Sequence, residues 1–310
     1  PVTKDGKRYG LPNLAEGKIS DSVVWIREDW RKKYNLPEPD TIEDLELIME
    51  TFKQNAPGGD GFIPFTMGLK NGFRDITPIF GAFGTIPEQW NLSETGGLEY
   101  GSVQPEAKAA LAKLNEWMNK GYLPSEAGVW DQAKSWEAFV SGKSGIVMGP
   151  PWMPWYPFPD LKSNFPEAEV KAYQAPAGPD GKRGRAGTAV VIGYLLVNND
   201  MKHPEALIEI QSYLYDNYAT RKAGSEFEYG LAKGYDWDIV DGKVTRDSAL
   251  IPDYMDPQHY LFMPTMATLP DGPKNRRTAV AEKLAANAEL SESEQIEYNF
   301  YPPEAWHSLR

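Results

Sequence analysis

Short apolar runs typical of β-strands alternate along this chain with amphipathic helical segments, and this order restricts the fold more than any other feature. Apolar, β-branched runs at 22–26, 170–175 and 188–197 predict strands: the first is suited to a buried strand, and the last gives the strongest strand signal. Strands that alternate with helices favour an α/β architecture over an all-α or all-β one. The helices, predicted from apolar residues three or four positions apart, begin near Thr41, Pro105 and Pro204.

The length and charge of the chain limit its organisation and its partners. A chain of 310 residues exceeds the usual size of one hydrophobic core, so two lobes are expected. No apolar run approaches the roughly 20 residues that span a bilayer. The net charge of −12 and the sequence pI near 4.9 would repel a phosphate backbone. We therefore expect no nucleic-acid partner.

Few residues of the chain are suited to metal binding or nucleophilic catalysis. There is no cysteine, which excludes disulfides, thiolate metal clusters and a cysteine nucleophile. The three histidines, at positions 203, 259 and 307, are isolated in sequence. The turn at 58–61 lacks the alternating oxygen ligands of an EF-hand, and 141–145 lacks the spaced glycines of a phosphate-binding loop. We expect no metal site, no cofactor and no catalytic residue.

Aromatic residues are abundant and gather in one stretch of the chain. The proline-rich segment 149–159 is predicted to be a loop, and it carries Trp152, Trp155 and Tyr156; Trp130 and Trp136 lie a short way before it. The axial C–H groups of a sugar pack well on an indole face, and a stiff loop loses little entropy on binding. The alternative is that these rings belong to the core. The pattern favours carbohydrate binding, above all for Trp152 and Trp155.

Carboxylates lie near these aromatic residues in sequence, which leaves a second class of function open. Two facing carboxylates would make a glycoside hydrolase, but no pair is singled out by a local signature. Glu94, Glu99 and Glu137 are expected to be solvated surface residues. Asp131, directly after Trp130, is kept as an acceptor for a ligand hydroxyl. A third possibility is a structural or interaction fragment without a ligand.

Six fragments in a fixed order resemble the extracellular solute-binding proteins of carbohydrate ABC transporters, the lipoprotein type within the maltose-binding-protein-like superfamily. The fragments are Asp5-Gly-Lys-Arg-Tyr-Gly-Leu-Pro12, Val24-Trp-Ile-Arg-Glu-Asp-Trp30, Pro105-Glu-Ala-Lys-Ala-Ala-Leu111, Phe139 to Met148, Gly149-Pro-Pro-Trp152 and Lys202-His-Pro-Glu-Ala206. The resemblance makes Trp152 the leading sugar contact. It also suggests Phe80 or Phe83 as a second stacking residue.

The resemblance further implies a periplasmic-binding-protein-like type II fold of two α/β lobes, with lobe one incomplete. It assigns 1–22 to a remnant of lobe one, 23–175 to lobe two and 176–235 to a further segment of lobe one. Residues 236–310 would cross the hinge and form an incomplete C-terminal segment. Two departures stand out: the segment 55–61 lacks the family's calcium-loop pattern, and family members are longer, so we expect a truncated piece.

Together these patterns lead to the hypothesis of a non-catalytic sugar receptor. A mono- or oligosaccharide would stack on Trp152 in an interlobe cleft, with help from Trp155, Tyr156 and Trp130. Closure about the hinge would then favour recognition by the permease subunits of an ABC transporter. We expect a monomer on the extracellular face of the cell membrane or in the periplasm. A lipid anchor absent from this chain would be its contact with the membrane.

Overall fold

The computed structural model describes residues 3–14, 20–93, 95–256 and 276–308, and it divides the chain into two compact units. Unit 1 comprises Pro1–Ile19 and Ala189–Pro303, and unit 2 comprises Ser20–Thr188 and Glu304–Arg310. The chain therefore passes between the units three times.

The expected segment bounds differ from these units mainly at 176–188 and at 304–310, which the structure groups with unit 2. Contacts with unit 2 explain this grouping. Ala177 forms backbone hydrogen bonds with Asp40 and Ile42 of unit 2, and Ala305 is buried in a core of the same unit. The assignment of segments to lobes stays a prediction.

A four-stranded sheet forms the centre of unit 2, in the order β5–β8–β4–β9. Strand β4 runs antiparallel to β8 and β9, and β5 runs parallel to β8. Because Val23 pairs with Gly149 and Val24 with Tyr173, the first residues of β4 lie beside the last residues of β8 and β9. We call this side of the sheet the carboxyl edge. The strands are β4 (Val23–Arg27), β5 (Ile63–Thr66), β8 (Ser144–Gly149) and β9 (Val170–Tyr173).

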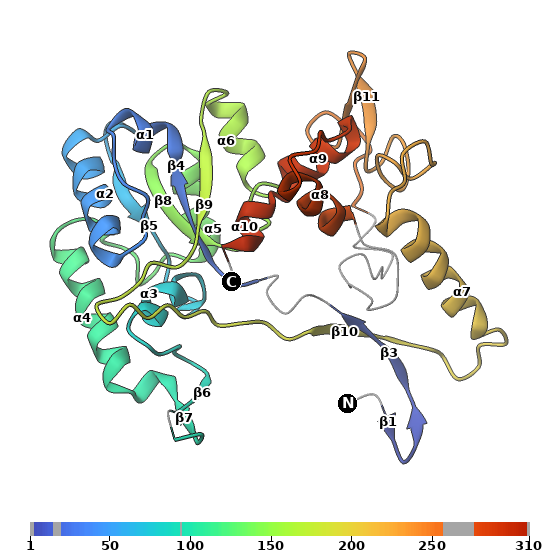
Figure 1. Ribbon diagram of the computed structural model, residues 1–310, viewed down its shortest axis with the longest axis horizontal. Coiled ribbons are helices and arrows are strands. Elements are labelled where there is room, and N and C mark those ends of the chain that lie inside the picture. The colour runs from blue at the N-terminus through green and yellow to red at the C-terminus, as the bar shows by residue number, and fades with distance from the viewer. Residues whose placement is uncertain (1–2, 15–19, 94, 257–275, 309–310) are drawn as a thin grey trace. The chain divides into compact units, whose positions relative to one another are not determined.

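Helices cover both faces of this sheet (Figure 1). Side chains of successive strand residues point to opposite faces, so each face of the sheet contributes to its own core. Val24 and Ile26 join a core with α2, α3 and α4, whereas Val23 and Trp25 join a second core with α5, α6 and α10. The bounds are α2 (Ile42–Asn55), α3 (Thr77–Ala82), α4 (Pro105–Asn119), α5 (Gln132–Val140), α6 (Phe158–Asn164) and α10 (Pro303–His307).

Two predicted helix starts in unit 2 are confirmed. Thr41 caps α2 in a full capping box with Asp44, and Pro105 is the first residue of α4. The shorter elements of the unit are α1 (Glu28–Lys33), η1 (Arg74–Ile76), η2 (Gly101–Val103) and a hairpin of β6 (Trp90–Leu92) and β7 (Leu98–Tyr100).

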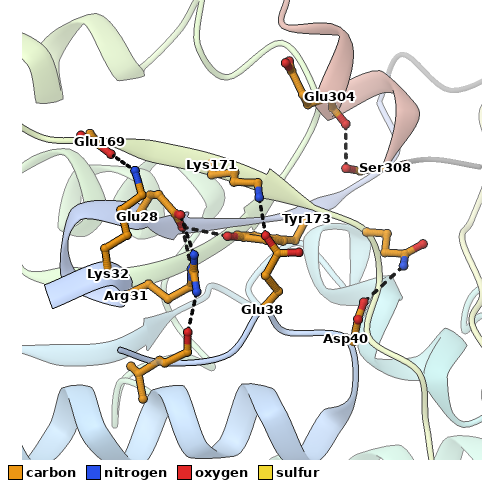
Figure 2. Close-up of polar contacts among 12 residues, drawn as sticks. Glu28, Arg31, Lys32, Glu38, Asp40, Glu169, Lys171, Tyr173, Glu304 and Ser308 are labelled. Atoms are coloured by element: carbon orange, nitrogen blue, oxygen red, sulfur yellow. Dashed lines mark hydrogen bonds and ion pairs between the residues drawn. The ribbon is translucent and has the colours of Figure 1, made fainter. Parts of the chain in front are cut away.

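Polar side chains of β9, the last strand of the sheet, form contacts with α1 and with the segment that follows α1 (Figure 2). The Tyr173 hydroxyl donates to Glu28 Oε2 at 2.7 Å, and Arg31 forms two hydrogen bonds with the same carboxylate. Burial alone would raise the pKa of Glu28, but these hydrogen bonds outweigh it, and the pKa lies below its ordinary value. Lys171 pairs with Glu38 nearby. These contacts hold β9 to α1 and to the segment that follows α1.

Unit 1 contains smaller sheets and helices. The hairpin turn predicted at Asp5-Gly6 is confirmed, since it joins β1 and β2. Strand β3 pairs antiparallel with β10, about 180 residues later in the chain. The elements are β1 (Thr3–Lys4), β2 (Lys7–Arg8), β3 (Gly10–Leu14), β10 (Val191–Leu196), α7 (Glu205–Leu214), η3 (Tyr215–Ala219), β11 (Asp238–Val240), β12 (Lys243–Thr245), α8 (Arg276–Ala285) and α9 (Glu292–Phe300).

A buried carboxylate, Glu297 of α9, ties together several parts of unit 1. Its oxygens lie 3.2 Å from Arg221, 3.6 Å from Arg246 and 3.4 Å from Arg277. Burial opposes its ionisation, but the surrounding arginines prevail and lower the pKa of Glu297. An ionised carboxylate is therefore built into the interior of this unit.

Candidate functional site

The carboxyl edge of the unit 2 sheet carries the residues best placed to bind a ligand. In open α/β sheets, ligands bind outside the carboxyl ends of the strands. Strand β8 ends here at Gly149, and the proline-rich loop 150–157 follows in a series of turns, as predicted. The indole of Trp25 donates to the carbonyl of Pro150 at 3.2 Å and anchors the loop. A Cβ at Gly149 would lie 2.5 Å from Met153 Sδ, so a larger residue there would displace the buried side chain of Met153.

Four aromatic rings form one continuous group, which we call the aromatic cluster: Trp136, Trp152, Trp155 and Tyr156. The ring centroids are 5.7 Å apart for Trp136–Trp152, 6.5 Å for Trp152–Trp155 and 6.2 Å for Trp136–Tyr156, all edge-to-face. Trp136 is buried, Trp152 and Trp155 are partly buried, and Tyr156 is 58% exposed. Three of the predicted contact residues are thus together and keep solvent-facing surface.

Trp130 and Asp131 have local structural roles beside the cluster. Asp131 caps α5, accepting from the backbone N–H of Lys134 at 3.0 Å, and its other oxygen lies 4.0 Å from Lys70 Nζ. The carbonyl of Trp130 accepts from the backbone of Lys70. Within the described residues, the Trp130 ring does not contact the rings of the cluster. A ligand-binding role for either residue stays a prediction.

The two phenylalanines suggested by the resemblance lie in different surroundings. Phe80, in α3, is 1% exposed and packs edge-to-face on Phe73 with centroids 4.9 Å apart. It is a core residue with no surface to present to a ligand. Phe83, just after α3, is partly buried against the same core and stays the candidate of the two.

Two of the carboxylates considered as catalytic partners, Glu99 and Glu137, are exposed and lie on different elements. Glu99 is exposed on β7, and Glu137 is exposed on α5, where it pairs with Lys134 at 2.9 Å. Glu94 lies outside the described residues, as does His259. No group of three potential metal ligands lies together in the described ranges.

A polar pair that the sequence analysis missed lies at the start of α5. The side-chain amide of Gln132 donates to Asp75 Oδ1 at 2.7 Å. Burial raises the pKa of Asp75 to about 6, against the opposing effects of the Gln132 hydrogen bond and Arg74. A carboxyl group with a perturbed pKa, near the side of the sheet where open α/β folds usually bind ligands, is a functional candidate. No local pattern could have revealed it, because the two residues are 57 positions apart.

Described residues of unit 2 line open cavities in this region, of which two are considered. The α5–α6 groove, of about 270 Å³, is lined by Gln132, Ala133, Trp136, Glu137, Val140, Tyr156, Pro157 and Asp160. The arginine cavity, of about 200 Å³, is lined by Ser22, Gln174, Ala175, Arg183, Gly184, Arg185 and Ser308. Both arginines of the arginine cavity have an acidic partner: Arg183 pairs with Asp40, and Arg185 pairs with the buried Asp21. Its positive charge is therefore already matched.

Comparison with known proteins reveals relatives in sequence. No family model matches the chain. It is 30% identical over 149 residues to the fructooligosaccharide ABC transporter substrate-binding protein FusA of Streptococcus pneumoniae, covering 44% of this chain and 27% of that protein. It is 32% identical over 155 residues to the polygalacturonan/rhamnogalacturonan-binding protein YtcQ of Bacillus subtilis, covering 48% and 30%. Lipoprotein LipO of B. subtilis is 27% identical over 260 residues, covering 78% and 48%. The matches thus cover less than half of each relative.

Solved structures show the same fold. The calcium-free alginate-binding protein AlgQ2 matches with a TM-score of 0.55 at 18% identity, covering 98% of this chain and 59% of that one. S. pneumoniae FusA in complex with kestose matches with a TM-score of 0.55 at 19% identity, covering 98% and 62%. The resemblance predicted from the sequence is confirmed as a similarity: the chain is similar in sequence to the substrate-binding protein FusA and the saccharide-binding protein YtcQ, and it shares the α/β fold of the solved binding proteins.

Proposed function

We propose that this protein is a non-catalytic receptor that binds a saccharide and delivers it to the permease of an ABC transporter. The observation that carries the proposal is the aromatic cluster at the carboxyl edge of unit 2, with Trp152, Trp155 and Tyr156 keeping exposed surface. The names of the sequence relatives, which include two saccharide-binding proteins, support it. Because the matches cover only part of each relative, ligand and partners belong to the proposal.

Binding would combine stacking with hydrogen bonds at the rim. The apolar face of a sugar packs on the indole of Trp155 or Trp152, and its hydroxyls need acceptors nearby. Gln132, held by Asp75, supplies an amide oxygen beside the cluster. Asp131, Trp130 and Phe83 are further proposed contacts. The proline-rich loop is already ordered, which reduces the entropy lost on binding.

Transport requires that the ligand change the population of a state that the permease recognises. The three passages of the chain between the units are where such a change would be centred. A ligand shifts this equilibrium only by its difference in affinity for the two states. We propose a monomer that works outside the cytoplasm, at the cell surface or in the periplasm, attached to the membrane through a lipid anchor. In the described ranges no helix has the length and apolar character of a membrane span.

The hydrolase alternative has less support. The sequence relatives FusA and YtcQ are named as binding proteins. A glycosidase also requires two carboxyl groups, about 5 to 9.5 Å apart, on either side of the scissile bond. Glu137, one of the carboxylates considered for such a pair, is engaged with Lys134.

The test is a calorimetric titration of the protein with neutral and acidic saccharides, paired with an assay for new reducing ends in the same mixtures. The proposal predicts saturable binding of at least one saccharide with no reducing ends formed. Reducing ends that disappear when one carboxylate is replaced would establish a hydrolase instead. An absence of heat across the whole panel would leave the receptor proposal without a ligand and overturn it.

A further inference from the structure

The α5–α6 groove offers a binding surface of its own next to the aromatic cluster. Buried Trp136 lies in it, while Tyr156 and Pro157 enter from the loop before α6. Its volume of about 270 Å³ is near the lower end of the roughly 300–1,000 Å³ of small-molecule sites. The groove is therefore sized for one small ring rather than a long chain.

The groove is lined by two acidic side chains, Glu137 and Asp160, and by two groups that can donate, the indole N–H of Trp136 and the hydroxyl of Tyr156. Gln132 donates one amide N–H to Asp75, which leaves its Oε1 and its second N–H for a ligand. Glu137 is exposed and pairs with Lys134, and Asp160 is exposed with no ion pair among the described residues. A matching ligand has an apolar face, several O–H donors and no negative charge. A neutral sugar residue meets these requirements, whereas a uronate carboxylate would be repelled.

Ring contacts connect the groove to the loop without a gap. Tyr156 contacts Trp136, Trp136 contacts Trp152, and Trp152 contacts Trp155. The groove thus opens beside the same rings on which the proposed function places a sugar. Resting on that function, we propose that the α5–α6 groove is a second subsite that takes one neutral sugar residue of an oligosaccharide whose neighbouring residues lie on the loop tryptophans.

The experiment measures affinity against chain length by calorimetry. The probes are two neutral series, glucose to maltotetraose and fructose through sucrose and kestose to nystose, with trigalacturonate as the acidic counterpart. We expect the affinity to rise about tenfold when the saccharide becomes long enough to enter the groove. The factor follows because one added aromatic contact contributes about 1.4 kcal/mol, which is tenfold in affinity. Trigalacturonate should bind more weakly than the neutral trisaccharide that binds best.

Substitutions distinguish binding in the groove from binding on the loop tryptophans. Tyr156→Ala should weaken the binding of chains long enough to enter the groove by a larger factor than it weakens the binding of shorter chains. Tyr9→Ala is the matched control, because Tyr9 has the same 58% exposure and lies in unit 1. Asp160→Asn should narrow the difference between the neutral and the acidic trisaccharide.

Three results would overturn the subsite while leaving the receptor in place: affinity that does not depend on chain length, equal losses for short and long chains in Tyr156→Ala, or trigalacturonate binding at least as tightly as every neutral trisaccharide. No binding to any of the probes would instead overturn the proposed function, and the subsite with it.

Discussion

Replacing Asp75 by asparagine should stabilise unit 2 at neutral pH. Raising the pKa of a carboxyl from 3.8 to about 6 costs its ionised form about 3 kcal/mol. Asparagine avoids that cost, and its Oδ1 still accepts the hydrogen bond that Gln132 now donates at 2.7 Å. Because burial is the main cause of the raised pKa, about 3 kcal/mol is the upper limit of the gain.

The gain should depend on pH in a direction that follows from the raised pKa. In the wild-type protein, protonation of Asp75 favours the folded state. Its contribution is therefore full below about pH 3.8 and is lost as the pH rises through about 6. Asp75→Asn should match the wild type near pH 4 and exceed it at pH 7.5.

Urea unfolding followed by tryptophan fluorescence is the assay, since every tryptophan except Trp237 belongs to unit 2. Asp75→Glu, which keeps a carboxyl group, is the control that should retain the pH dependence. A variant Asp75→Asn that is less stable than the wild type at pH 7.5, or that differs from it equally at both pH values, would refute this reasoning.

Three further substitutions test other parts of the structure. Gly145→Ala should cost unit 2 about 1–3 kcal/mol in urea unfolding, because its Cβ would lie 2.3 Å from the buried ring of Phe52; an unchanged midpoint would contradict the packing described. Glu297→Gln should destabilise unit 1 by about 3–5 kcal/mol, seen as faster hydrogen exchange in α8 and α9, because Arg221 and its neighbours lose their counter-charge. Since the pKa of Glu297 is lowered, wild-type protection should be full above about pH 4.5 and fall as the pH drops through that lowered pKa; exchange that does not change with pH would count against the cluster. Thr41→Ala should cost about 1 kcal/mol through loss of the cap on α2, with the partly buried Thr51→Ala inside the same helix as the control, and equal effects of the two would contradict the capping role.

Features of the fold that depend on neighbours in sequence could be predicted. The start of α2 follows from Thr41 and Asp44, which are three residues apart, and the start of α4 follows from Pro105. The strand at 22–26 was identifiable from its β-branched residues, and all five residues of β4 are buried. The loop after Gly149 followed from its prolines. In each case the controlling interaction is local.

Features that depend on distant residues could not be predicted. Phe80 and Phe83 have similar surroundings in sequence, and only the packing of α3 decides that Phe80 is buried. The Asp75–Gln132 pair arises because the segment after β5 meets the start of α5, which no spacing in the chain reveals. The cap that Asp131 forms on α5 differs from these, because its partner Lys134 is three residues away and the contact is local.

The most direct test of the account is a crystal structure of the protein with the saccharide that binds most tightly in the titration. The account predicts a sugar ring in van der Waals contact with the indole of Trp152 or Trp155 at the carboxyl edge of unit 2. A saccharide bound in unit 1 alone, or on the β6–β7 hairpin with the rings of the aromatic cluster uncovered, would contradict it.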